Sequence, residues 1–370
     1  ETSEECLKET LAVVKKANEY LDSKSNGPKL RAVDEVDVAE VLPRVRGQFS
    51  KAAHKVVHVD KRFLEIANRS DLKEVVSAGV SSADHMLRIR PFSIVLDDLS
   101  ADGIGAAFDK YSSDYDDYTA RNIELLPEGY DLLDSIPRVA LIPGLGAITS
   151  GSSLAEAKMV AEIALHTHKV ASQVLDSFGV GESMPDSEIF RFEYWPMELY
   201  KLSLKPGPKK FSARVFIVTG AASGIGLGVS KHLASLGSSL VLADLNEEKL
   251  DVVRAQLEND HGIDVVAVPG DQSDPDVVSA TVLAAVEAFG GLDGIVANAG
   301  IAVTDSLADL DFDRWKKALE VNLDSAFLLA QGAIRLMEKQ AMGGSLVFNA
   351  SKNAFAPGAG FGAYSVTKAG

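Results

Sequence analysis

The stretch RVFIVTGAASGIG, residues 214–226, decides the fold of the second part of this chain. It opens with an apolar run typical of a buried strand, passes through a turn with three glycines, and leads into a helical pattern. Such a turn lets the backbone approach a pyrophosphate, and free N–H groups at the helix start attract its charge. The alternative is a glycine turn without a ligand. The stretch predicts a dinucleotide site at Gly220, Ser223, Gly224, Ile225 and Gly226.

Asp244 stands at the end of the next apolar run. A carboxylate at this place accepts hydrogen bonds from both ribose hydroxyls of a dinucleotide and repels a 2′-phosphate. The residues that follow, Leu245 and Asn246, offer no arginine to neutralise such a phosphate. The sequence therefore favours NAD over NADP as the cofactor. The alternative role for Asp244 is that of a helix cap, because a helical pattern follows it.

Apolar runs and helical patterns alternate through the second part of the chain. Strands are expected at 214–218, 239–243, 265–268, 294–297 and 345–349. Helices are expected at 226–236, 247–257, 275–289 and 312–339, the last of them broken near Asn322. This alternation is typical of parallel strands that are covered by helices and joined by right-handed crossovers. The predicted fold class is α/β, a doubly wound parallel sheet of the Rossmann type, preceded by a mixed α/β region.

Further motifs make the segment 214–370 resemble a known family. The TGxxxGxG turn, the Asn298-Ala299-Gly300 motif after the fourth strand, and the Tyr364-x-x-x-Lys368 pair follow the order of short-chain dehydrogenases/reductases. The resemblance implies an NAD-dependent alcohol dehydrogenase. It implies catalytic roles for Ser351, Tyr364, Lys368 and Asn322. It also implies cofactor contacts for Asp271, Gln272, Asn298, Ala299, Gly300, Tyr364 and Lys368, beside the glycine turn and Asp244.

Tyr364 and Lys368 carry the expected chemistry, because residues with this spacing share one face of a helix. A phenol has a pKa of about 10, too high for a base at neutral pH, and a nearby ammonium lowers that value. Tyr364 then takes the alcohol proton as hydride leaves, or returns it in reduction. By the resemblance, Lys368 also binds the nicotinamide ribose and Ser351 holds the substrate oxygen. The backbone of Asn322 anchors a water that leads to Lys368, and Asn298 steadies the sheet.

The first part, residues 1–205, has a mixed pattern and is followed by a linker rich in Pro, Gly and Lys at 206–213. Helices are expected at 2–21, 38–45, 71–77, 106–126 and 154–175, and strands at 55–59, 94–96 and 138–142. Thr2 and Glu5 have capping-box spacing at the start of the first helix.

The glycine segment PGLGAITSG, residues 143–151, is expected to be a loop between a strand and a helix, forming one βα unit. A phosphate could bind at the start of that helix. Because the loop holds no lysine or arginine, a packing turn is the favoured interpretation. The aromatic segment EYWPMELYKL, residues 193–202, is expected to be packed.

The first part also resembles a known family, namely the later portion of the aldolase half of bifunctional class II aldolase/short-chain dehydrogenase fusions. The matching stretches are ETSEECLKET at 1–10, SSADHMLRIRP at 81–91, PRVALIPGLG at 137–146 and EYWPMELYKL at 193–202. The resemblance implies rhamnulose-1-phosphate cleavage and lactaldehyde oxidation, as in rhamnose catabolism. The three metal-binding histidines of that family precede its ETSEEC stretch, so no metal ligand is expected in this chain.

Three histidines of the first part are candidate site residues. His166 and His168 are two residues apart, but on the expected helix such side chains point roughly 200° apart and cannot share one ion. No carboxylate–histidine cluster completes a metal site there. His85, beside Asp84 and Arg88, is a functional candidate, and a salt-bridged turn is the alternative.

Composition excludes several classes of protein. Of the 370 residues, 46% are hydrophobic and 24% are charged, ordinary values for a globular protein of two domains. A formal net charge of −16 repels phosphate backbones and argues against a nucleic-acid partner. No apolar run reaches the roughly 18 residues of a membrane span. The single cysteine, Cys6, excludes an internal disulfide and favours a cytoplasmic location.

The expected function is NAD-dependent oxidation of a small hydroxy-aldehyde, lactaldehyde by the resemblance, in a homo-oligomer. The chain begins at Glu1 and ends inside an expected helix, so we expect a fragment of a longer polypeptide. Loss of the last third of the dehydrogenase domain would open the substrate pocket and reduce activity. Two alternatives stay open: a stand-alone sugar or polyol dehydrogenase with an unrelated N-terminal domain, and a non-catalytic cofactor-binding module.

Overall fold

The computed structural model describes residues 2–204 and 206–370, without the side chains of Ala83 and Asp84. Glu1, Lys205 and the carboxylate expected beside His85 therefore lie outside the described residues. The chain divides into two compact units, each described by itself. The first unit comprises Glu1–Val36, Val59–Thr149 and Lys158–Pro206. The second unit comprises Asp37–His58, Ser150–Ala157 and Gly207–Gly370.

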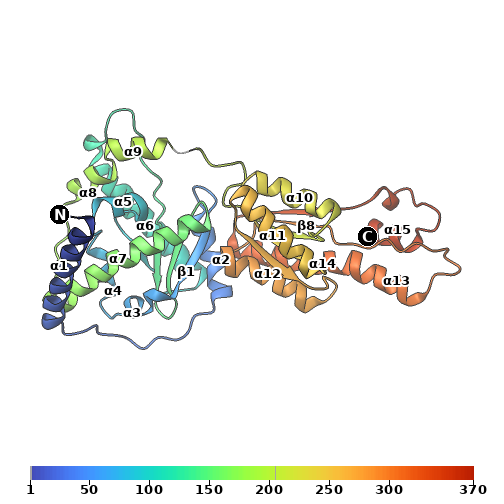
Figure 1. Ribbon diagram of the computed structural model, residues 1–370, viewed down its shortest axis with the longest axis horizontal. Helices are drawn as coiled ribbons and strands as arrows, with labels where there is room; N and C mark the ends of the chain where they lie inside the picture. Colours follow the sequence, from blue (N-terminus) through green and yellow to red (C-terminus); the bar gives the residue numbers. More distant parts are fainter. Residues whose placement is uncertain (1, 205) are drawn as a thin grey trace. The chain divides into compact units, whose positions relative to one another are not determined.

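The second unit is built on a five-stranded parallel sheet of order β7-β6-β5-β8-β9 (Figure 1). Its strands are β5 (Val215–Thr219), β6 (Ser239–Asp244), β7 (Val265–Pro269), β8 (Gly294–Ala297) and β9 (Ser345–Phe348). The helices after Gly207 are α10 (Gly224–Ser235), α11 (Glu247–His261), α12 (Pro275–Phe289), α13 (Phe312–Leu319), α14 (Ser325–Gln340) and α15 (Gly362–Ala369), with a short 3₁₀ helix η4 (Lys352–Ala354). The chain fills one side of β5 first and then crosses to the other side with β8. The predicted doubly wound parallel sheet is confirmed.

The strands and helices of this sheet follow from local sequence signals. Every residue of β5 and β8 is buried, as expected for strands with helices on both faces. Asn246 caps the start of α11 and Asp274 caps the start of α12 through side-chain acceptors. Both helices end at glycines in the left-handed conformation, Gly262 and Gly290. α12 has the predicted bounds, and α11 begins at the predicted residue but continues to His261, past the predicted end at 257.

The break expected near Asn322 is a π-helical turn, η3 (Glu320–Asp324), between α13 and α14. Such a turn inserts an extra residue into the helix and often marks a functional position. Asn322, within this turn, is buried, at 6% exposure.

The segment Asp37–His58 belongs to the second unit. Its helix α2 (Val38–Phe49) begins after Asp37, whose carboxylate accepts the Ala39 N–H, and it packs against α12 and α14. The helix continues past the predicted end, although it contains Pro43. Its apolar residues Val41, Leu42, Val45 and Phe49 are buried.

A four-stranded sheet has the order β1-β4-β3-β2; β2, β3 and most of β4 belong to the first unit, whereas β1 begins in the Asp37–His58 segment. Its strands are β1 (Val56–Asp60), β2 (Ile94–Val95), β3 (Val139–Ile142) and β4 (Gly146–Gly151). β2 runs parallel to β3, and β4 runs antiparallel to it. The surrounding helices are α1 (Ser3–Lys24), η1 (Lys61–Phe63), α3 (Leu64–Ala67), α4 (Leu72–Ser77), α5 (Ala83–Ile89), α6 (Ala101–Arg121), η2 (Ile123–Leu125), α7 (Leu154–Phe178), α8 (Asp186–Glu193) and α9 (Pro196–Ser203).

The expected strand–loop–helix unit around residues 143–151 is wrong. β3 turns back at once and pairs with β4 as a hairpin in which Ile142 lies opposite Gly146. Gly144 and Gly146 have φ angles of 81° and 112°, which side-chain-bearing residues avoid. A Cβ on Gly144 would lie 2.1 Å from the carbonyl oxygen of Asp34. Since every residue of β4 is buried, this segment is a core strand and not a phosphate-binding loop.

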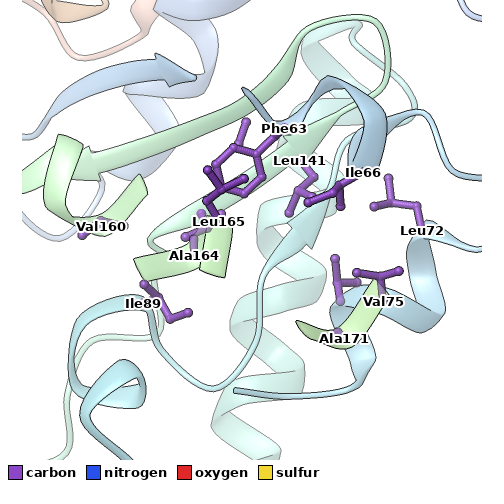
Figure 2. Packing of buried hydrophobic residues seen from close by; sticks show 13 residues of the cluster. Phe63, Ile66, Leu72, Val75, Ile89, Leu141, Val160, Ala164, Leu165 and Ala171 are labelled. Atoms are coloured by element: carbon purple, nitrogen blue, oxygen red, sulfur yellow. The ribbon is translucent and has the colours of Figure 1, made fainter. Parts of the chain in front are cut away.

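The core of the first unit forms where α7 packs beside β3 and the helices that precede it. Figure 2 shows Val160, Ala164, Leu165 and Ala171 from α7 in one cluster with Leu141 of β3. The same cluster includes Phe63, Ile66, Leu72, Val75 and Ile89. Small residues at the middle of α7 let that helix lie close to the sheet.

Two amphipathic or aromatic segments are less buried than expected. In 193–202, Glu193 and Tyr194 are buried, but Trp195 is 46% and Tyr200 is 55% exposed, so the expected packing holds only at its start. α1 has the predicted capping box but contains no buried residue. Among residues 2–204 and 206–370, no helix has both the length and the apolar composition of a membrane span.

Candidate active site

A pocket of about 690 Å³ opens at the carboxyl edge of the second sheet, where the strand order reverses. Ligands of open α/β sheets bind at this kind of place. Most of the predicted site residues line it: Gly220, Ser223, Gly224, Ile225, Asp244, Asp271, Gln272, Asn298, Ala299, Gly300, Ser351, Tyr364 and Lys368. Gly226 and Asn322 do not line the pocket, but each contacts residues that do.

The glycine turn after β5 is shaped by close backbone contacts. Gly220 has a φ of 65°, and a Cβ there would lie 2.9 Å from Nδ2 of Asn298. A Cβ on Gly226 would lie 2.1 Å from the carbonyl oxygen of Gly220. Ser223 precedes α10 but its side chain makes no capping bond, so the first N–H groups of the helix stay available to a ligand. The turn has the shape and the donors that a pyrophosphate requires.

Asp244 is held between the glycine turn and the start of α11. Its Oδ2 accepts the Ala222 N–H at 3.0 Å and its Oδ1 accepts the Asn246 N–H at 3.0 Å. The residue that caps α11 is Asn246, whose side chain accepts the Lys249 N–H. The cap role considered for Asp244 therefore belongs to Asn246, and the carboxylate lines the pocket.

Asp271 follows β7 and is oriented by a lysine that the sequence reasoning missed. Lys317 of α13 donates from Nζ to Oδ2 of Asp271 at 2.9 Å and to the Ser273 hydroxyl at 3.1 Å. Hydrogen bonds from Ser273 and then from Lys317 lower the pKa of Asp271 to about 2. Neighbouring Gln272 is buried and its amide donates to the Thr281 hydroxyl at 3.3 Å. No sequence signal separates Lys317 from the adjacent Lys316, since their roles depend on the helix rotation.

The Asn298-Ala299-Gly300 motif ties β8 to β5. The backbone N–H groups of Asn298 and Ala299 both donate to the Thr219 hydroxyl, each at 3.0 Å. Nδ2 of Asn298 donates to the Thr219 carbonyl oxygen at 2.9 Å, and its Oδ1 accepts from Asn349 Nδ2 at 2.7 Å. These bonds hold the two central strands and the β9 end together at the pocket edge.

Asn322 braces the loop after this motif against the last helix. Its Oδ1 accepts the Ile301 N–H at 2.7 Å, and its Nδ2 donates to the Ile301 carbonyl oxygen at 2.9 Å and to the Thr367 hydroxyl at 3.0 Å. One side chain of the π-helical turn η3 thus links the loop at Ile301 to α15. The amide positions the helix that carries Tyr364 and Lys368.

Tyr364 and Lys368 lie on one face of α15 and both line the pocket. Lys368 Nζ is 5.8 Å from the centre of the Tyr364 ring and donates to the Asn349 carbonyl oxygen at 2.8 Å. Burial lowers the pKa of Lys368 from its ordinary value. Ser351 lines the same pocket, and its hydroxyl accepts the Asn353 N–H at 3.3 Å. A phenol, an ammonium and a hydroxyl are thus available at the β9 end of the pocket.

The sequence matches the models of two protein families. Residues 214–370 match the short chain dehydrogenase family. Residues 36–202 match the second domain of class II aldolases. The second part of the chain is a short-chain dehydrogenase domain. It follows an aldolase class II second domain in the same chain, as the resemblance of both parts predicted.

Relatives of the dehydrogenase domain are oxidoreductases. The "Uncharacterized oxidoreductase YuxG" of Bacillus subtilis (strain 168) is 30% identical over 391 residues, covering 100% of this chain and 56% of its own length. The cis-4-hydroxycyclohexanecarboxylate dehydrogenase of Sinomonas cyclohexanicum is 40% identical over 162 residues, 43% of this chain and 64% of its own. The crystal structure of L-sorbose reductase from Gluconobacter frateurii with NADPH and L-sorbose has a TM-score of 0.42, at 31% identity, over 44% of this chain and 62% of that one. This chain therefore spans less than two thirds of the length of each relative.

The pocket of the dehydrogenase domain fits a nicotinamide dinucleotide. The uncapped start of α10 and the glycine turn suit the pyrophosphate, and a carboxylate at the end of β6 suits a ribose. Lys368 and Tyr364 lie toward the opposite, β9 end of the pocket. A dinucleotide bound there would have its adenosine half beside β6 and β7 and its nicotinamide half beside β9.

The histidines considered in the first unit make local contacts instead of a cluster. His168 is buried, its Nε2 lies 3.1 Å from the Ser93 hydroxyl, and burial lowers its pKa to about 4. His85 Nδ1 lies 2.8 Å from the Thr167 hydroxyl, and its ring lies edge-on to that of His166. Across the part of the chain that the structure describes, no group of three or more His, Cys, Asp or Glu side chains could hold a metal ion.

Proposed function

We propose that the dehydrogenase domain oxidises a small hydroxy compound with NAD as the hydride acceptor, and that Tyr364 is the acid/base. The observation that carries this proposal is the placement of Tyr364, Lys368 and Ser351 around the β9 end of a dinucleotide-shaped pocket. Bound NAD supplies the hydride acceptor. The protein's own groups supply proton transfer and orientation.

The proton path starts at the substrate hydroxyl. Ser351 can hold that oxygen with its own hydroxyl, and Tyr364 Oη takes the proton while the substrate C–H bond breaks. The Lys368 ammonium is fixed by the Asn349 carbonyl oxygen and lies 5.8 Å from the centre of the Tyr364 ring, so it supplies positive charge beside the acid/base. In the reverse direction the same phenol returns the proton to the carbonyl oxygen.

The preference for NAD rests on Asp244. Its carboxylate is anchored by two backbone N–H groups, and each of its oxygens keeps a free lone pair for a ribose hydroxyl. A 2′-phosphate at the same place would meet a fixed negative charge. Lactaldehyde is the substrate we favour, by the resemblance to class II aldolase/short-chain dehydrogenase fusions; the match of residues 36–202 to the second domain of class II aldolases supports that resemblance.

The test of this function is turnover of Tyr364→Phe. We expect oxidation of lactaldehyde by the unaltered chain, a loss of about 10²–10⁴-fold in the variant, and unchanged NAD binding by calorimetry. A binding module without catalysis would show NAD binding and no turnover in either protein. Oxidation of sugars or polyols in place of lactaldehyde would support a stand-alone polyol dehydrogenase.

We also propose a cytoplasmic homo-oligomer that acts on a small molecule. The one cysteine, Cys6, is free and exposed, which fits a reducing compartment. The dehydrogenase domain exposes large apolar side chains on α14, among them Phe327 at 60% and Ile334 at 43%. Such side chains suit a contact between copies. Light scattering of the chain at several concentrations tests this assembly.

A further inference from the structure

The first unit contains a second pocket, of about 660 Å³, that the dehydrogenase chemistry does not use. It lies between α4, the strand β2 and one long face of α6. The residues of α6 that line it recur at helical spacing, from Gly103 through Ala107 and Tyr111 to Arg121. This volume is in the range of small-molecule sites, which is roughly 300–1,000 Å³.

The floor of this pocket is aromatic, and its rings are held from behind. Phe92, Tyr111, Tyr115 and Tyr118 form it. The hydroxyls of Tyr115 and Tyr118 donate inward to the buried Glu193 carboxylate, at 2.7 and 3.2 Å. Their polar ends are therefore held by Glu193. Tyr115 and Tyr118 are each 1% exposed and Tyr111 is 6% exposed, so only small parts of these rings reach the pocket. Tyr111 stacks on Tyr115 at an interplanar angle of 13°.

A buried ion pair, Glu193 with Arg90, lies behind these rings. Glu193 and Arg90 are 1% and 5% exposed, and Arg90 Nη1 lies 3.3 Å from Glu193 Oε1. Arg90 has a φ of 67°, a strained conformation for a residue with a side chain. The Tyr111 hydroxyl is buried without a hydrogen-bond partner in the described structure. Buried ion pairs and strain of this kind are retained where a fixed geometry is needed.

The mouth of the pocket is ringed by charges, and most of them are already paired. Lys110 pairs with Asp114 and Arg121 pairs with Asp186, each at 2.7 Å. Asp98 differs from these residues. It accepts the Ser100 N–H at 2.9 Å, and within the described residues no cation lies in ion-pair range of its carboxylate.

One further carboxylate of the mouth, Asp97, is shared by two cations. It lies 2.8 Å from Arg31 and 3.9 Å from Lys73. The position of Asp98 is constrained, because a Cβ on Gly103 would lie 2.2 Å from its Cγ. Among the carboxylates of the mouth that the structure describes, Asp98 is thus the one without a cation, and it lies against Gly103 in the first turn of α6.

We infer that this pocket binds a small organic cation, with its apolar part against Phe92, Ala107 and the exposed edge of Tyr111 and an ammonium group at Asp98. The aromatic and aliphatic side chains of the lining favour an apolar group over a fully polar one. An anion is disfavoured at this pocket. The lysine and arginine of its mouth named above are already paired with carboxylates, Asp98 is negative, and the whole chain has a net charge of −16. The site is independent of the dehydrogenase pocket.

Three indole compounds that differ mainly in charge test the inference on the whole chain: tryptamine, tryptophol and indole-3-acetate. Binding is measured by calorimetry and by saturation-transfer NMR. We expect tryptamine to bind at least about tenfold more tightly than indole-3-acetate, with tryptophol between them, which is a difference of about 1.4 kcal/mol or more. Equal binding of the cation and the anion, or no binding of tryptamine, would overturn the inference.

A matched pair of variants locates the site. Ala107 lines the pocket and Ala106, its neighbour on α6, is exposed on another face. Ala107→Phe should weaken tryptamine binding by at least about tenfold, the scale of a lost buried contact, while Ala106→Phe leaves it unchanged. Equal effects of the two variants would place the binding elsewhere.

The charge assignment has its own variant, which leaves the pocket volume unchanged. Asp98→Asn should remove the advantage of tryptamine over tryptophol and leave tryptophol binding as it was. Because Asp98 is exposed, this variant keeps the fold intact even where Ala107→Phe does not. An unchanged preference for tryptamine in Asp98→Asn would reject the role of this carboxylate.

Discussion

Arg46 and Asp293 form an ion pair inside the second unit, with Nη2 and Oδ2 2.6 Å apart and side chains 0% and 5% exposed. The two residues stand 247 positions apart in the sequence. Oδ2 of Asp293 also accepts the Val215 N–H at 2.7 Å, and Arg46 Nε donates to the Lys55 carbonyl oxygen at 2.8 Å. The pair therefore joins the segment that carries α2 to the amino ends of β5 and β8.

Replacing one member of this pair should destabilise the second unit strongly. Arg46→Met leaves the Asp293 carboxylate buried and without its cation, which costs about 3–5 kcal/mol of unfolding free energy. The measurement is urea unfolding followed by Trp315 emission in a Trp195→Phe background, because each unit contains one of the two tryptophans.

The control for this prediction is the double variant Arg46→Met with Asp293→Asn. The asparagine keeps an acceptor for the Val215 N–H and carries no charge, so much of the lost stability should return. A loss below about 1 kcal/mol in Arg46→Met alone would show that the pair is not energetically coupled to the fold.

The same carboxylate should make the second unit sensitive to acid. Burial raises the pKa of Asp293, but Arg46, His54 and the Val215 N–H together hold it below the ordinary value. A folded pKa below the unfolded value of about 3.9 means that the stabilisation is complete above that pH and is lost as pH falls through the folded pKa. The Trp315 unfolding free energy should therefore fall more steeply below about pH 4 than in Asp293→Asn. Parallel curves for the two proteins would contradict this assignment.

Adding a methyl group at Gly226, in the glycine turn, should weaken cofactor binding. A Cβ on Gly226 would lie 2.1 Å from the Gly220 carbonyl oxygen, so Gly226→Ala must displace the turn. We expect at least about tenfold weaker NAD binding by calorimetry. Gly228→Ala, on the same helix with no atom within 4 Å of its Cβ, is the control. It should bind NAD normally and stabilise α10 by up to about 1 kcal/mol.

Removing the Asp244 carboxylate should change the choice of cofactor. Asp244→Ala loses the ribose acceptor and the repulsion of a 2′-phosphate, so we expect weaker NAD binding and stronger NADP binding. Calorimetry with both cofactors gives the ratio of the two dissociation constants. If that ratio is the same in Asp244→Ala and in the unaltered chain, this residue does not select the cofactor.

Lys317 should act on only one half of the cofactor. It orients the Asp271 carboxylate beside β7, at the adenosine end of the pocket. Lys317→Met should raise the dissociation constants of NAD and ADP several-fold and leave that of nicotinamide mononucleotide unchanged. Lys316→Met serves as the matched control, because Lys316 lies beside Phe312 and Asp313 instead of Asp271. Equal weakening of all three ligands would indicate a general loss of structure.

Much of the dehydrogenase domain is determined by the sequence alone. The apolar runs, the glycine turn after β5, the caps of α11 and α12, and the break at Asn322 are local signals, each set by a few neighbouring residues. Their order along the chain specifies a parallel sheet, since short crossovers have one favourable hand. The motif residues follow, because the carboxyl ends of parallel strands meet at one edge.

Tertiary structure determines the features that depend on contacts between residues far apart in the chain. The hairpin of β3 and β4 replaced an expected loop because small buried residues carry no clear periodicity. The Lys317–Asp271 contact depends on helix rotation, and the Arg46–Asp293 pair on a distant segment returning to the second sheet. Tyr115 and Tyr118, which line the pocket along α6, bond to Glu193, which lies 75 or more residues further along the chain. Local propensity determines the elements, whereas burial and charge pairing between distant residues determine the sites.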